Sequence, residues 1–107
     1  MSANRTVSDR SWTEDVLLSD GPVLVDFTAD WCPPCRKLSP LLAELATEFG
    51  GRVRILELDI DTNPLASRDY GVLSAPTMIL FKGGEPVQSM VGLRPKPVLT
   101  SWIEAAL

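Results

Sequence analysis

The sequence has 107 residues, of which 45% are hydrophobic and 22% are charged, and its formal net charge at pH 7 is -4. This length provides for one domain, residues 1–107, with a single hydrophobic core, and no apolar stretch reaches the roughly 18 residues that a membrane span requires. The acidic balance and the lack of a basic stripe exclude nucleic acid and membranes from the expected partners.

The N-terminal segment carries charged residues that no apolar run follows, so the sequence predicts no secretory signal, and we expect a monomeric protein in the cytoplasm. Residues 5–7 are a weak candidate for a strand. Ser11 and Glu14 have the spacing of a capping box and predict a short helix through Leu18, which a Gly-Pro pair ends. The apolar run over residues 23–28 is typical of a buried strand.

The longest expected helix begins after this strand, near Cys35, and ends at a pair of glycines. Its apolar residues recur at helical spacing, namely Leu38, Leu41, Leu42, Leu45 and Phe49. Pro40 removes one backbone hydrogen bond inside this helix, and we expect a kink there. The pattern therefore predicts an amphipathic helix with one face against the core.

The middle of the chain predicts a second strand and a short helix. The strand is expected over residues 53–58. Asn63 and Pro64 then provide an N-cap residue and a helix-starting proline, and the short helix is expected to end near Tyr70.

The C-terminal part predicts a hairpin and a closing helix. Strands over residues 77–81 and 87–91 are joined by the turn KGGE. The closing helix is indicated by apolar residues at helical spacing, namely Val98, Leu99, Trp102, Ile103 and Ala106. The order β-α-β-α-β-β-α predicts an α/β fold in which helices cover both faces of a mixed sheet.

The two cysteines, Cys32 and Cys35, are separated only by Pro33 and Pro34 and lie where the buried strand passes into the longest helix. A structural disulfide closing so short a loop would stabilise the fold by only about 2 kcal/mol, and a cytosolic compartment tends to reduce it. A zinc site needs about four ligands, whereas the sequence supplies two cysteines and no histidine. We prefer a redox-active dithiol, which fits both the compartment and the strand-helix context.

The position of the cysteines predicts different roles for the two sulfurs. At a helix N-terminus the free amides and the dipole stabilise a thiolate, so we expect Cys32 to be the exposed attacking sulfur, with a pKa lowered from ~8.5 toward ~7. Cys35, one turn further, is then the resolving thiol, and its placement makes the second exchange intramolecular. Pro33 and Pro34 stiffen the turn and are expected to tune the site.

Several segments together resemble thioredoxins in order and spacing over essentially the whole chain, namely VLVDFTADWCPPC, the later Pro40, SAPT, KGGE and VGL. The resemblance implies the thioredoxin fold, in which four α-helices flank a central five-stranded mixed sheet. It also implies reversible dithiol-disulfide exchange on protein substrates and a part in cell redox homeostasis. No bound cofactor is expected, and electrons would come from NADPH through thioredoxin reductase, a flavoprotein.

The same resemblance implies roles for residues around the cysteines. Pro76 would be a cis proline packed against them, although by sequence alone it is also an ordinary strand-starting proline. With Trp31, Ala75, Val91 and Gly92 it would form the apolar groove that receives the substrate chain.

Asp26 is a carboxylate inside an apolar run, so its burial would raise its pKa. The resemblance implies a buried acid that relays a proton to or from Cys35, whereas alternation along the strand also permits a solvent-facing position. Thr28, Pro33 and Glu57 depart from many thioredoxins, which carry tryptophan, glycine and lysine there. Either Glu57 lies beside Asp26 and forms a coupled pair of carboxylates, or it reaches solvent at the strand end.

Two functional classes fit the sequence. The first is a general disulfide reductase, and the second is an interaction or regulatory module dedicated to one partner, with an idle or redox-sensing dithiol. The segment WCPPCRK also resembles reductases that serve cytochrome maturation outside the cytoplasm. Those proteins carry a signal or membrane anchor and usually an insertion within the fold, and we find neither pattern in the sequence.

Overall fold

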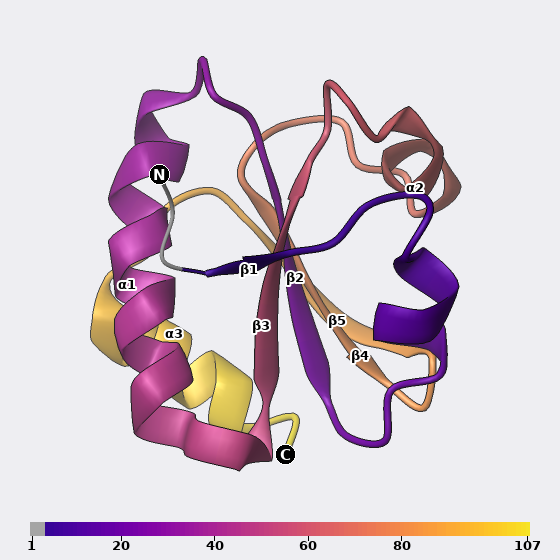
Figure 1. Cartoon of the computed structure of the whole chain (residues 1–107). Coiled ribbons are helices and arrows are strands. Elements are labelled where there is room, and N and C mark those ends of the chain that lie inside the picture. The colour runs from indigo at the N-terminus through magenta and orange to yellow at the C-terminus, as the bar shows by residue number, and fades with distance from the viewer. Residues whose placement is uncertain (1–3) are drawn as a thin grey trace.

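Most residues of the three inner strands of the computed structural model are buried and apolar. β2 (Val23–Thr28) and β3 (Arg54–Asp59) pair in parallel, and β4 (Thr77–Lys82) pairs antiparallel with the other side of β2. β1 (Arg5–Thr6) and β5 (Glu85–Val91) complete a five-stranded sheet in the order β1-β3-β2-β4-β5 (Figure 1). The predicted mixed sheet is therefore confirmed.

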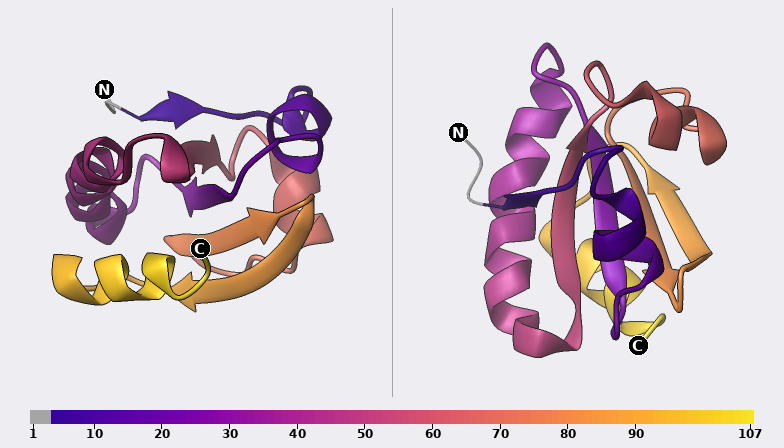
Figure 2. Two further views of the ribbon diagram at one scale, coloured as in Figure 1. Left: turned by 90° about the horizontal axis from the view of Figure 1, so that it is seen from below. Right: turned by 45° about the vertical axis from the view of Figure 1, so that its right-hand side comes forward.

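Helices cover both faces of this sheet, as the sequence predicts. α1 (Pro33–Phe49) and α3 (Lys96–Glu104) pack on one face, whereas η1 (Thr13–Leu17) and α2 (Pro64–Asp69) lie on the other (Figures 1 and 2). Each helical layer buries its own apolar cluster against the sheet. The sheet therefore separates two hydrophobic cores.

Alternation along the central strands decides which side chains reach the α1 layer. Leu24 belongs to the core under α1 and α3, whereas Phe27 belongs to the opposite core. Because side chains alternate along a strand, Asp26 projects to the same side as Leu24, toward α1. In β3, Ile55 also belongs to the α1 core, so Glu57 projects to that side as well.

The first helix differs from the prediction. Within residues 4–107, three of the four flanking helices are α-helices, whereas η1 is a five-residue π-helix. The predicted capping box of Ser11 with Glu14 is wrong, because Ser11 bonds to an earlier residue. The Ser8 N–H donates to Ser11 Oγ at 3.0 Å, and the Ser11 N–H donates to Ser8 Oγ at 3.2 Å. The reciprocal arrangement therefore forms three residues earlier.

The structure describes residues 4–107. The prediction that the N-terminal segment is not a secretory signal therefore falls partly on residues 1–3, which lie outside the described part. None of the helices in this part combines the length with the hydropathy that a membrane span requires. Pro40 lies inside α1, and the kink expected there stays a prediction. Asn63 is the N-cap residue of α2, as predicted, but its side chain makes no capping bond. The limits of β3, β4 and β5 differ from the predicted ones by one or two residues.

Candidate active site

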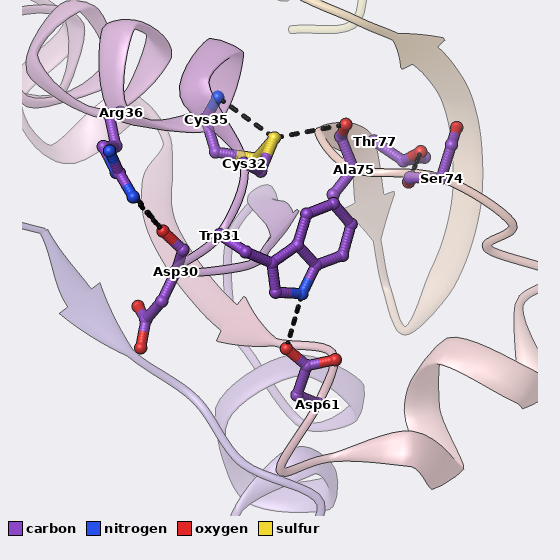
Figure 3. Close-up of a disulfide and its surroundings, with 9 residues drawn as sticks. All are labelled: Asp30, Trp31, Cys32, Cys35, Arg36, Asp61, Ser74, Ala75 and Thr77. Atoms are coloured by element: carbon purple, nitrogen blue, oxygen red, sulfur yellow. Dashed lines mark hydrogen bonds between the residues drawn. A yellow bond between two sulfur atoms is a disulfide. The ribbon is translucent and has the colours of Figure 1, made fainter.

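The two cysteines lie where β2 delivers the chain to the first turn of α1. Cys32 is the N-cap residue with extended backbone, Pro33 is the first helical residue, and Cys35 follows within the first turn. This spacing brings the two Cα atoms to 5.3 Å, and Cys32 and Cys35 form a disulfide (Figure 3). The Cys35 backbone N–H is directed at Cys32 Sγ, with a separation of 3.3 Å.

Both half-cystines are buried in this disulfide form. Cys32 and Cys35 are each only 2% exposed, so the predicted exposure of Cys32 is wrong for the oxidised state. The side chains of Ala29, Ile60 and Ala75 pack around the pair, and the Ala75 carbonyl oxygen lies 3.4 Å from Cys32 Sγ. Because an oxidised sulfur carries no hydrogen, this is a packing contact, and it covers the side of Cys32 that faces the loop before β4.

That loop carries the predicted wall of the site. The Ala75–Pro76 peptide bond is cis, as the resemblance implies. The Gly92 N–H donates to the Pro76 carbonyl at 2.8 Å, and Gly92 has a φ of 91°, a conformation that favours glycine. Its neighbour Val91 is 53% exposed. The structure therefore brings the 75–76 and 91–92 segments together beside Cys32.

Trp31 forms another side of the site. It is 62% exposed. Its Nε1–H donates to Asp61 Oδ2 at 2.8 Å, which fixes the indole beside the disulfide (Figure 3). The sequence analysis missed Asp61, because a loop carboxylate thirty positions away from Trp31 gives no local signal.

Asp26 is wholly buried on the α1 side of the sheet, which excludes the solvent-facing alternative. Neither of its carboxylate oxygens has a hydrogen-bond partner among residues 4–107. Burial away from water, together with the nearby charge of Glu57, raises the pKa of Asp26 to about 8. Asp26 therefore changes its protonation state near neutral pH.

Glu57 is paired with Asp26 in the parallel register of β3 with β2. It is only 7% exposed, so the structure differs from the alternative in which it reaches solvent. Its Oε2 accepts hydrogen bonds from Ser39 Oγ at 2.6 Å and from Asn4 Nδ2 at 2.7 Å. The structure thus places two carboxyl groups side by side under α1.

A groove of about 660 Å³ opens beside the disulfide, and its lining includes Cys35, Ser39, Glu57 and Thr28. Figure 3 shows Arg36, another lining residue, on the opposite side of the disulfide from Ala75. The sequence analysis missed Ser39, although its position four residues after Cys35, on the same helix face, was a usable signal.

Among residues 4–107 no group of three or more candidate ligands is arranged to hold a metal ion.

Comparison with known proteins agrees with this geometry. The thioredoxin family model matches residues 3–105. A thioredoxin of Synechocystis is 47% identical over 107 residues, which cover 100% of both chains. A thioredoxin of Rhodospirillum rubrum is 46% identical over 103 residues, covering 96% of this chain and 99% of its own. A thioredoxin of Mycobacterium tuberculosis is 49% identical over 98 residues, covering 92% of this chain and 84% of its own.

Proposed function

Because the chain belongs to the thioredoxin family of protein disulfide oxidoreductases, we propose that Cys32 is its attacking sulfur and Cys35 its resolving sulfur. The disulfide at the N-terminus of α1 carries this proposal, since the Cys35 amide is directed at Cys32 Sγ. Such an amide and the helix dipole stabilise a thiolate on the N-cap residue. Cys32 is therefore the sulfur that reacts first with a substrate.

Reduction of a substrate takes two exchanges. The Cys32 thiolate attacks one sulfur of the substrate disulfide, forms a mixed disulfide and releases the first substrate thiolate. Cys35 then loses its proton and attacks Cys32 Sγ, which closes the Cys32–Cys35 bond and releases the second substrate thiolate. Two electrons pass from the dithiol to the substrate, and each released thiolate takes up a proton from water. Because Cys35 is held within one helical turn of Cys32, the second exchange is intramolecular.

Asp26 serves this chemistry as a proton relay for Cys35. Its ionised form accepts the Cys35 proton during resolution, and its protonated form returns a proton to Cys35 when the protein's own disulfide is reduced. A pKa of about 8 supports this role, because a proton donor and acceptor works best when its pKa lies near the working pH. Glu57, Pro33 and Pro34 tune the site around it.

The substrate chain binds along the surface formed by Trp31, Ala75, Pro76, Val91 and Gly92. Two observations support this surface: the Ala75 carbonyl contacts Cys32 Sγ, and the side chains of Trp31 and Val91 are exposed and offer apolar area. A protein disulfide bound there would lie directly over the buried sulfur that must attack it.

We further propose that the disulfide is returned to the dithiol by thioredoxin reductase, with electrons from NADPH, and that the chain acts as a monomer in the cytoplasm. Its family supports these assignments, since a thiol carrier needs a reductase to turn over. Its substrates are proteins that contain disulfides.

Trapping tests the assignment of the two sulfurs. The variant Cys35→Ser should accumulate a mixed disulfide between Cys32 and a peptide or protein substrate, because the resolving thiol is missing. The variant Cys32→Ser should trap none. Mass spectrometry of the non-reduced products measures both, and the reverse pattern would overturn the assignment.

A further inference from the structure

A second buried carboxylate, Glu57, has a hydrogen-bond partner on α1, whereas the Asp26 carboxylate has none among residues 4–107. Ser39 follows Cys35 by four residues, so the two side chains lie on the same face of α1. The Ser39 hydroxyl donates to Glu57 Oε2 at 2.6 Å. A serine hydroxyl can donate one hydrogen bond and accept others at the same time. Ser39 is therefore placed to connect the Cys35 side of α1 with Glu57 on β3.

The groove gives these groups a common aqueous space. Its lining includes Cys35, Ser39 and Glu57, and its volume of about 660 Å³ exceeds many times the roughly 30 Å³ that one water molecule occupies in the liquid. Its polar lining supplies the hydrogen-bond partners that an ordered water requires. A chain of water molecules can therefore reach the Cys35 side of the disulfide from this groove.

We propose that Glu57, connected through Ser39 and the water of this groove, is a second proton acceptor for the Cys35 thiol. This inference rests on the proposed function, because it concerns the step in which Cys35 resolves the mixed disulfide. Below pH 8 the raised pKa of Asp26 leaves only part of this carboxyl ionised, so Asp26 can take up the Cys35 proton in only a fraction of the molecules. The second carboxylate supplies an acceptor for the rest.

The step balances without a further reactant. The Cys35 thiol gives its proton to a groove water, that water gives one to Ser39 Oγ, and Ser39 passes its own hydroxyl proton to the Glu57 carboxylate. The Cys35 thiolate then attacks Cys32 Sγ, the bond between Cys32 and the substrate sulfur breaks, and the substrate leaves as a thiolate. Glu57 returns its proton to the solvent of the groove, which protonates the released thiolate.

Other charged groups lie beside Glu57 or line the same groove. They are Asp26 on β2, Arg36 and Glu44 on α1, and Asp30 in the loop between β2 and α1. Glu44 provides a matched control, because it is a carboxylate on the same groove but forms an ion pair with Lys96 Nζ at 3.2 Å. Replacing Glu44 changes the charge of the groove without touching the Ser39 connection.

The experiment measures release of the second substrate thiol in a single turnover between pH 5 and pH 9. The peptide disulfide is present at a concentration where the rate no longer depends on it, which isolates the resolving step. In Asp26→Asn, release should persist. Adding Glu57→Gln or Ser39→Ala to that variant should slow release at pH 7 by at least about tenfold. In the same Asp26→Asn background, Ser39→Thr keeps the hydroxyl and should restore the rate of release. Glu44→Gln should leave that rate within about twofold of the rate of Asp26→Asn, since the charge of the groove alone has a modest effect.

Two outcomes would overturn the inference. The first is that Asp26→Asn with Glu57→Gln releases thiol at the same rate as Asp26→Asn at every pH, because Glu57 would then act only through its charge on Asp26. The second is that Asp26→Asn alone abolishes release. Failure of the proposed function is distinguishable from both, since the unaltered protein would then release no substrate thiol.

Discussion

The buried carboxyl of Asp26 lowers the stability of the folded protein at neutral pH. Its pKa in the folded protein is about 8, against 3.8 for an aspartate in water. The folded state therefore binds this proton more tightly than the unfolded state. Below pH ~4 Asp26 is protonated in both states, and it does not lower the free energy of unfolding. As the pH rises from ~4 to ~8, the unfolded state loses this proton first, so the free energy of unfolding falls. Above pH ~8 the loss is constant.

Replacing Asp26 with asparagine should therefore stabilise the protein in a pH-dependent way. Each pKa unit corresponds to about 1.4 kcal/mol, so the free energy of unfolding at pH 7 should rise by up to about 4 kcal/mol. Urea unfolding at pH 4, 6, 8 and 9 measures the difference, which should be small at pH 4 and should grow until pH 8. Asp20→Asn, at an exposed position, is the control. A difference for Asp26→Asn that did not change with pH would contradict the burial account.

Glu57 contributes the second cause of the raised pKa of Asp26. Glu57→Gln removes a like charge and keeps an amide oxygen that can accept from Ser39, so the pKa of Asp26 should fall. It should stay above 3.8, because burial is the larger cause. Carbon-detected NMR titration of the Asp26 carboxyl measures the midpoint. An unchanged titration curve would show that the two carboxyls are not coupled.

At the scale of an element, the start of α2 is stabilised from outside the helix. The side chain of its N-cap residue Asn63 makes no capping bond. The Asp9 carboxylate instead accepts from the backbone N–H groups of Leu65 at 3.0 Å and Ala66 at 2.9 Å. In return, Asn63 Oδ1 accepts from the Asp9 N–H at 2.9 Å. The N-terminal segment and α2 are therefore joined by a cap that spans more than fifty residues of sequence.

Asp9→Ala should consequently destabilise the protein although Asp9 belongs to no helix. Two amides of α2 would lose their acceptor, and loss of a cap typically costs about 1 to 2 kcal/mol. Chemical denaturation of Asp9→Ala beside the loop control Asp20→Ala measures this cost. Equal stability of the two variants would mean that the Asp9 cap does not contribute.

The same element shows where prediction from sequence ends. Local signals placed α2 correctly, since Pro64 marks its start, but they assigned its cap to Asn63. The residue that makes the capping bonds comes from a distant turn, and a local pattern contains no information about it. The predicted capping box of Ser11 with Glu14 is wrong for a related reason. Ser8 and Ser11 have the same spacing of three residues, and they form the reciprocal hydrogen bonds instead.

At the scale of the whole molecule, hydrophobic periodicity was sufficient to predict a mixed sheet, the helices that cover it and the position of the dithiol. It was not sufficient to predict that the segment 75–76 lies beside the cysteines. Pro76 was placed against the cysteines by resemblance alone, and the position of the Ala75–Pro76 segment beside Cys32 depends on pairing of β4 with β2 and β5. The burial of Cys32 was missed, because Ala75 and Ile60 reach the sulfur only after the chain has folded.

The Asp26–Glu57 arrangement follows from strand register, which sequence left open. Alternation permitted either face for Asp26, and only the parallel pairing of β2 with β3 puts Glu57 beside it. Ser39 completes the arrangement from α1. The proton transfers that we propose therefore use three elements that are separate in the chain, while the two sulfurs come from one helical turn.

The central claim is that Cys32 and Cys35 carry electrons to protein disulfides. Reduction of insulin, driven by NADPH and a bacterial thioredoxin reductase, tests it most directly. The unaltered protein should consume NADPH in proportion to the insulin disulfides reduced, and Cys32→Ser should consume none above background. A folded, reduced sample of the unaltered protein that supported no turnover would contradict the claim and favour a dedicated interaction module with an idle dithiol.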